Sequence, residues 1–215
     1  VGNISEADSA ERLVALGADG IKVGQGAGSI CTTRIVTGVG RPQVTAIYEV
    51  ANAIAGRNVP VCADGGIRYS GDIPIALAAG ASSVMMGNLL AGTDESPGDI
   101  VVINGVRMKK YRGMGSVGAI MGNPDRYGHS VKVEKGKVIS EGVEAHVPCK
   151  GKLEEVLVQC LGGLKSSMAS FGARTIEEAQ EKARFERMTN AGIVESHPHD
   201  IIGISGAPNY PRHGE

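Results

Sequence analysis

One pattern occurs twice along this 215-residue chain: Gly-Ala, two further residues, and an apolar–any–apolar triplet closed by Gly. The copies occupy residues 17–24 and 80–87. Each predicts a helix end, a tight turn, a short buried strand and a glycine where the strand stops. Quasi-repeated βα units predict a parallel sheet and favour a (β/α)₈ TIM barrel, whose ligand-binding loops follow the strands. The pattern alone leaves a doubly wound sheet open.

Apolar periodicity extends this prediction to particular elements. Helices are expected over 6–16, 43–55, 71–79 and 152–170, with another opened by a capping-box pattern at Thr175, and strands over 20–23, 59–63 and 83–86. A complete barrel needs eight βα units, and only about four precede residue 92. We therefore expect a C-terminal half-barrel whose first residues lie just past a mid-barrel strand.

Three segments follow from these elements. Residues 1–92 hold the barrel units, 93–150 form a polar, glycine-rich segment interpreted as a mobile catalytic flap, and 151–215 hold C-terminal helices and a tail of the same domain. Hairpins are expected around Asn104-Gly105 and Lys135-Gly136. From Ala191 onward no clear periodicity is visible.

Charge and cysteine content exclude several classes of function. A net charge of −1 favours neither a nucleic-acid nor an anionic-membrane partner. The four cysteines are scattered, which argues against a zinc site and a disulfide framework and fits a reducing, cytoplasmic compartment. No apolar run is long enough to span a membrane, and Val1 is not followed by the basic region of a signal peptide.

The most informative loop, residues 24–34, reads GQGAGSICTTR and directly follows a predicted strand. Its alternating glycines allow the backbone to approach a ligand closely. Cys31 is interpreted as a nucleophile, with Arg34 and backbone N–H groups lowering its pKa and Thr32 and Thr33 handling protons. The competing interpretation is a small buried apolar residue.

Two further strand ends carry polar signals. Asp64 is suited to accept hydrogen bonds from a ribose diol, although it could equally cap a turn. Ser29, Gly66 and Gly87 could converge on a phosphate dianion without a lysine, and Asn88 adjoins this cradle. The stretch 195–199 (ESHPH) suggests a metal cluster, but its spacing around a proline is poor for ligation from a helix.

Four motifs together resemble the inosine-5′-monophosphate dehydrogenase family: GxGxGSICTTR ending at Arg34, ADGGI at 63–67, YRGMGS at 111–116 and the Arg126-Tyr127 pair. The resemblance covers essentially the whole chain in the same order. It implies a (β/α)₈ barrel, a homotetramer and the oxidation of IMP to XMP with NAD⁺ and water, in guanine nucleotide biosynthesis. By the same resemblance, Cys31 forms a covalent thioimidate with the purine, and Arg126 acts as general base with Tyr127 and Thr33.

The resemblance also implies the binding residues. For the substrate these are Ser29, Asp64, Gly66, Gly87, Asn88, Tyr111, Met114, Gly115 and Glu141, of which Asp64 holds the ribose, the last three read the purine edge and the rest hold the phosphate. Relatives commonly have serine at the position of Asn88. For the cofactor they are Asn3, Lys22, Gly24 and Gly26, with Asn3 and Lys22 at the nicotinamide carboxamide. For K⁺ they are the carbonyls of Gly26, Gly28 and Cys31, joined by Glu195, Ser196 and His197 of a neighbouring subunit.

The chain departs from the family in extent. The N-terminal half of the barrel, the paired regulatory CBS domains and an aspartate that contacts NAD lie outside it, so the polypeptide alone is expected to be inactive. Three alternatives remain: an NADPH-dependent GMP reductase, which shares the cysteine loop, a non-catalytic nucleotide-binding half-barrel, and a redox-inert phosphosugar-binding barrel. The Arg126-Tyr127 pair favours the dehydrogenase.

Overall fold

The computed structural model describes residues 1–123, 138–203 and 206–210. Its first sheet has four parallel strands in the order β1 (Gly2–Ile4), β2 (Ile21–Val23), β3 (Val61–Asp64) and β4 (Ser83–Met85). The connections are helical: α1 (Ala7–Ala15), the short α2 (Thr33–Thr37), α3 (Gln43–Ala53) and α4 (Asp72–Ala78), with α5 (Asn88–Ala91) after β4. The predicted α/β fold with a parallel sheet is confirmed.

Side chains alternate across this sheet, as the period of a strand requires. Ile21 and Val23 are buried, and Lys22 between them lies half-buried on the opposite face. Val61 and Ala63 of β3 share the buried face, where they join the core formed with α3. One face therefore packs on helices, and the other carries Lys22 and Asp64.

Two predictions at the sheet edges were wrong. The first residues do not lie past a strand, since Gly2–Ile4 is itself a strand paired with β2. The strand at 83–85 is not buried: Ser83 and Met85 are exposed, and Met85 keeps 48% of its surface open. An apolar run predicts burial, but none of the described elements covers this face of β4.

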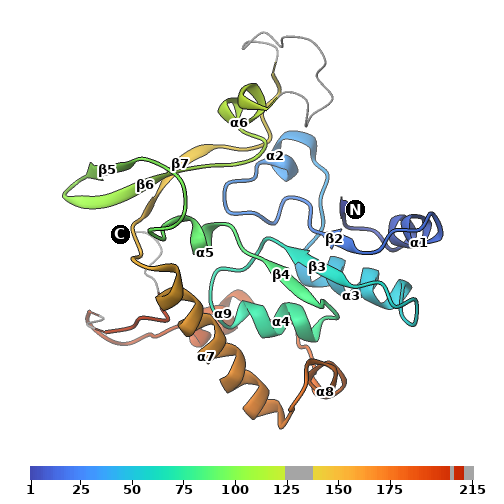
Figure 1. The fold of residues 1–215 in the computed structure, drawn as a ribbon. Helices are drawn as coiled ribbons and strands as arrows, with labels where there is room; N and C mark the ends of the chain where they lie inside the picture. The colour runs from blue at the N-terminus through green and yellow to red at the C-terminus, as the bar shows by residue number, and fades with distance from the viewer. Residues whose placement is uncertain (124–137, 204–205, 211–215) are drawn as a thin grey trace.

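The segment after Thr93 contains a second sheet rather than irregular chain. It is antiparallel and consists of β5 (Ile100–Ile103), β6 (Val106–Arg112) and β7 (Glu144–Pro148), with α6 (Val117–Gly122) between the last two, and it lies to one side of the parallel sheet (Figure 1). The hairpin at Asn104-Gly105 is confirmed, with φ values of 51° and 79° that suit a two-residue turn. The hairpin expected at Lys135-Gly136 lies outside the described residues.

Lys109 attaches the second sheet to the segment that follows α5. Its side chain, on β6, is only 3% exposed. The ammonium group donates hydrogen bonds to the carbonyls of Thr93 (2.5 Å), Ser96 (2.7 Å) and Asp94 (3.3 Å). All three N–H donors thus have backbone acceptors, which compensates for the burial of this charge.

Three helices complete the chain: α7 (Leu153–Phe171), α8 (Ile176–Lys182) and α9 (Asn190–Ser196). Helices α7 and α8 pack on α4, and Thr175 caps α8 by accepting a hydrogen bond from the Glu178 amide, as the capping pattern predicts. Helix α9 was not predicted, since it carries no capping-box pattern like that of α8. Among the described helices, none combines the length and apolar character needed to cross a lipid bilayer.

The repeat gives a matched test of packing. Gly17 and Gly80 occupy equivalent positions, with φ values of 89° and 110°. A Cβ at Gly17 would meet nothing within 4 Å, whereas one at Gly80 would overlap the Cβ of Ala51. Alanine at either position is expected to cost about 1–2 kcal/mol for left-handed backbone, and Gly80→Ala about 1–3 kcal/mol more for overpacking.

Urea unfolding of the two variants measures this difference. In the double variant Gly80→Ala/Ala51→Gly, the removed methyl should recover the additional loss, which appears as a coupling energy between the two positions. Equal losses for Gly17→Ala and Gly80→Ala would contradict the packing argument.

Candidate active site

The loop after β2 crosses the end of β3 at very close range. Gly24 has a φ of 148°, and a side chain there would overlap the carbonyl oxygen of Asp64. The Gln43 amide donates hydrogen bonds to the carbonyls of Val23 (3.0 Å) and Asp64 (3.2 Å), which ties the two strand ends together. Further along, Gly65 lies against the loop, where a Cβ would come within 3.1 Å of the Gly28 nitrogen. The cysteine loop therefore lies on the Asp-Gly-Gly turn.

Cys31 belongs to a hydrogen-bonded chain of three side chains. Its Sγ lies 3.1 Å from Thr33 Oγ1, and Thr33 Oγ1 donates to Glu141 Oε2 at 2.8 Å. A threonine hydroxyl has one proton, and here it is directed to the carboxylate. The Cys31 thiol is therefore the donor towards Thr33. This arrangement offers a path for a proton from the sulfur, through the hydroxyl, to Glu141.

Backbone pairing holds Glu141 in place. The Thr32 amide donates to the carbonyl of Glu141 (2.8 Å), and the Glu141 amide donates to the carbonyl of Gly115 (3.0 Å). Isolated β-bridge pairing also joins Cys31 to Gly142. All three expected purine-edge residues, Met114, Gly115 and Glu141, thus lie on segments paired beside the cysteine loop.

Three of the five expected phosphate residues, Ser29, Gly87 and Tyr111, lie close together. A Cβ at Gly87 would lie 2.7 Å from the hydroxyl of Tyr111, so this hydroxyl rests on the glycine. Partial burial raises the pKa of Tyr111, a hydrogen bond with Ser29 opposes this, and the Asp64 carboxylate raises it further. The Gly65 amide donates to the carbonyl of Met85, one residue before Met86-Gly87. The hydroxyls of Ser29 and Tyr111 thus lie beside Gly87, near the turn at Gly65.

Asp64 is held by two side chains from neighbouring strands. Its Oδ2 accepts hydrogen bonds from Lys22 Nζ at 2.7 Å and from Asn3 Nδ2 at 2.9 Å. The second Asn3 proton goes to the Gly24 carbonyl at 2.8 Å. Resemblance to the family placed Asn3 and Lys22 at the cofactor, but here their hydrogen bonds are directed to the Asp64 carboxylate and the loop.

The hydrogen bonds of the Arg34 side chain go to backbone carbonyls of the surrounding loops. Its Nε donates to the carbonyl of Gln25 at 2.9 Å, and its Nη2 donates to the carbonyl of Arg41. Side chains at Gly26 or Gly40 would overlap Arg34, so the arginine fills the space between these two loop segments. The guanidinium therefore stabilises the conformation of the loop through these two carbonyls.

Sequence reasoning missed Gln43 and the Lys109 anchor, and placed Glu141 only by resemblance. Gln43 opens a helix, and no local pattern indicates that its amide reaches two strand ends. Arg126 and Tyr127, the predicted base and its assistant, lie outside the described residues. Asn88 opens α5, and its carbonyl accepts from Lys150 Nζ at 3.3 Å.

The expected cation ligands in the tail lie at the end of α9. Glu195 and Ser196 are its last residues, and His197 follows. The His197 ring is occupied: its Nδ1 lies 2.6 Å from the Tyr210 hydroxyl, and it packs edge-on against Tyr69. Within the described residues no group of three or more His, Cys, Asp or Glu side chains is arranged to hold a metal.

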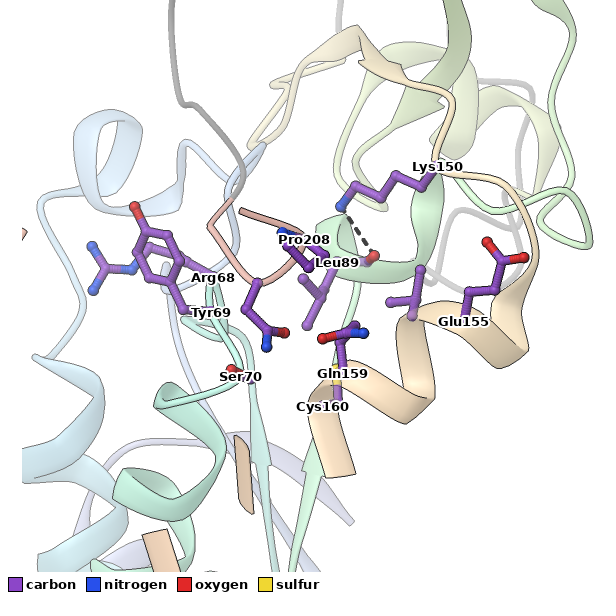
Figure 2. Close-up of a pocket in the computed structure, with 11 residues that line it drawn as sticks. Arg68, Tyr69, Ser70, Leu89, Lys150, Glu155, Gln159, Cys160 and Pro208 are labelled. Atoms are coloured by element: carbon purple, nitrogen blue, oxygen red, sulfur yellow. Dashed lines mark hydrogen bonds between the residues drawn. The ribbon is translucent and has the colours of Figure 1, made fainter. Parts of the chain in front are cut away.

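A pocket of about 510 Å³ lies between the loop after β3, α5, α7 and the tail (Figure 2). Its walls include Arg68, Lys150 and Cys160, and Lys150 donates to the carbonyl of Leu89 at 3.0 Å. Burial lowers the pKa of Lys150 and raises that of Cys160. None of the predicted catalytic or binding residues lines it.

A cysteine loop and polar strand ends gathered at the carboxyl edge of parallel βα units are the arrangement of α/β-barrel enzymes. Comparison with known proteins makes this specific. Residues 1–199 match the model of the IMP dehydrogenase / GMP reductase domain. The chain belongs to this family.

Individual relatives agree. The chain is 56% identical to the inosine-5′-monophosphate dehydrogenase of Methanocaldococcus jannaschii and 55% identical to that of Chlorobaculum tepidum, over 98% and 97% of its own length. It spans 44% and 43% of these relatives. It also superposes on GMP reductase from Trypanosoma brucei, solved in complex with guanosine 5′-monophosphate, with a TM-score of 0.85 and 46% identity over 94% of this chain and 40% of that one. The fold is thus a part of a (β/α)₈ barrel.

The Tyr111 phenol offers a test of the phosphate-site geometry. Because the Asp64 charge disfavours the phenolate, Asp64→Asn is expected to lower the pKa of Tyr111, measured by ultraviolet titration with Tyr111→Phe to identify its signal. Asp19→Asn, at an exposed aspartate, is the matched control. The pKa of Tyr111 is higher in the folded state than its ordinary value of 10.0. The stability that the neutral phenol contributes is therefore fully present below pH 10.0 and is lost as the pH rises through the pKa of the folded state. An unchanged titration in Asp64→Asn would contradict this proximity.

Proposed function

We propose that this chain is the cysteine-bearing part of an IMP dehydrogenase, which oxidises IMP to XMP with NAD⁺ and water in guanine nucleotide biosynthesis. The observation that carries the proposal is the Cys31–Thr33–Glu141 chain, 3.1 and 2.8 Å between successive atoms, beside a cradle of Ser29, Gly87 and Tyr111. The names of its relatives support IMP as the substrate.

In the proposed mechanism the Cys31 sulfur attacks C2 of the hypoxanthine ring. Its proton passes to Thr33, while the Thr33 proton passes to Glu141. NAD⁺, when bound, accepts the hydride that leaves C2, and a thioimidate remains on Cys31. Water then attacks C2 and XMP departs, which returns the thiol. Arg126 and Tyr127 are proposed to activate this water, and an arginine needs a strongly organised site for that task because a guanidinium is very reluctant to lose its proton.

We assign Asp64 to the ribose, Ser29, Gly66, Gly87, Asn88 and Tyr111 to the phosphate, and Met114, Gly115 and Glu141 to the purine. For NAD⁺ we assign Gly24 and Gly26 from the resemblance of this loop to the family.

Potassium is proposed to bind carbonyls of Gly26, Gly28 and Cys31 together with Glu195, Ser196 and His197 of a neighbouring subunit in a homotetramer. The geometry of α9 supports the second set, since carbonyl groups at a helix C-terminus carry partial negative charge. The His197 ring is engaged with Tyr210, so only its backbone oxygen is assigned to the cation.

The GMP reductase reaction is the second candidate, favoured by the similarity to the solved GMP reductase. Both reactions use a cysteine loop and a nucleotide cradle, so assays must separate them. The expected result is NADH formation from IMP and no NADPH consumption with GMP. The reverse pattern would replace the dehydrogenase proposal with the reductase.

Covalent trapping tests the role of Cys31. Incubation of the chain, joined to the N-terminal half-barrel, with IMP and NAD⁺ should add the mass of the oxidised nucleotide to the peptide containing Cys31, and Cys31→Ala should abolish the adduct and lower turnover by about a thousandfold or more. Cys149→Ala, at a cysteine outside the cluster, should keep both. Full turnover in Cys31→Ala would indicate a different mechanism, and nucleotide binding with no adduct would favour a non-catalytic binding module.

The extent of the chain gives a separate prediction. We expect the polypeptide alone to be inactive and activity to appear when the N-terminal half-barrel is supplied, because the face carrying Lys22, Asp64 and the exposed Met85 then acquires its missing wall. Steady-state NADH formation by the chain, with and without that half, measures this. Full activity from the chain alone would contradict it.

A further inference from the structure

Three neighbouring strands of the parallel sheet contribute one polar side chain each to a single point. Asn3 lies on β1, Lys22 on β2 and Asp64 at the end of β3. Lys22 is 32% exposed and Asp64 24%, so the ion pair is partly shielded from water. Such shielding strengthens the attraction and makes an unpaired carboxylate costly.

The hydrogen bonds fall on one of the two carboxylate oxygens. Oδ2 accepts from both Lys22 Nζ (2.7 Å) and Asn3 Nδ2 (2.9 Å), whereas no described residue donates to Oδ1. The orientation of the Asn3 amide follows from its partners, since Gly24 O and Asp64 Oδ2 are both acceptors and require the NH₂ group between them. The backbone of Asp64 is fixed as well, by the Gln43 amide.

We propose that Lys22 and Asn3 are positioning residues for ribose recognition: they anchor Oδ2 of Asp64 and thereby present Oδ1, with its two lone pairs, to the two hydroxyls of the substrate ribose. A diol is neutral and cannot balance a carboxylate, so Lys22 also supplies the opposite charge beside Asp64. The inference rests on the proposed function, because it takes IMP as the ligand. It replaces a contact of these two residues with the nicotinamide by a role in binding the nucleotide substrate.

A cofactor contact and a positioning role affect different binding equilibria. A cofactor contact changes the affinity for NAD⁺ and leaves IMP binding in its absence unaltered. Positioning of Asp64 changes IMP binding with no cofactor present, and it changes most the part of the affinity that depends on the ribose hydroxyls. Comparison of IMP with 2′-deoxy-IMP isolates that part.

The experiment measures equilibrium binding of both nucleotides, without NAD⁺, to the chain joined to the N-terminal half-barrel. Lys22→Met is expected to weaken IMP binding about tenfold, the scale of one hydrogen bond to a charged group, and to reduce the preference for IMP over 2′-deoxy-IMP. Lys22→Arg, which keeps a cation near Oδ2, should restore most of both. Asn3→Ala should give a smaller loss of the same kind, about severalfold.

Lys165→Met, at an exposed lysine on α7, is the matched control and should bind as the unsubstituted protein does. Thermal unfolding of each variant identifies any general loss of structure, which would weaken IMP and 2′-deoxy-IMP equally. Unchanged IMP affinity in Lys22→Met, with only the KM for NAD⁺ raised, overturns the inference and leaves the proposed function standing. No IMP binding by the unsubstituted assembly overturns the proposed function and the inference together.

Discussion

The close approach of Gly24 to the carbonyl of Asp64 is the constraint on which the site depends. Because no side chain intervenes, the chain leaving β2 can cross directly over the end of β3. Gln43 secures the crossing with hydrogen bonds to both strand ends. The cysteine loop is consequently laid on the Asp-Gly-Gly turn, and the proposed nucleophile and the proposed ribose acceptor share one support. A larger residue at position 24 would move the loop carrying Cys31 away from Asp64.

Local patterns predicted the part of the fold that local forces determine. Period-two and period-3.6 burial gave the parallel strands and their helices, and Asn104-Gly105 gave the hairpin, because each depends on residues close in sequence. Helix α9 and strand β1 were missed because neither carries the signals that indicated elements of equal length, which are the Gly-Ala turn before β2 and β4 and the capping-box pattern of α8. The exposure of β4 was missed for another reason, since an apolar strand does not reveal whether an element is present to cover it.

In the candidate site, too, some residues are indicated by local sequence and others only by tertiary contacts. The loop 24–34 and the turn at Asp64 stand out by composition, so their candidacy follows from the sequence. The partner of Thr33 does not: Glu141 is 108 positions away and reaches it only through pairing of two distant loops. Lys22 was assigned to the cofactor through resemblance, and only the distance to Asp64 Oδ2 indicates a second role. Such long-range contacts depend on tertiary structure, which single motifs do not encode.

The burial of Lys109 has a mechanical consequence for the second sheet. Lys109 and Tyr111 are two residues apart on β6, so their side chains extend from the same face of the strand. The ammonium group fixes that face against three carbonyls after α5, and the phenol a few ångströms further along is thereby aimed at Gly87. Lys109 thus fixes the part of β6 next to Tyr111, so the direction of the phenol is set by the segment that follows α5.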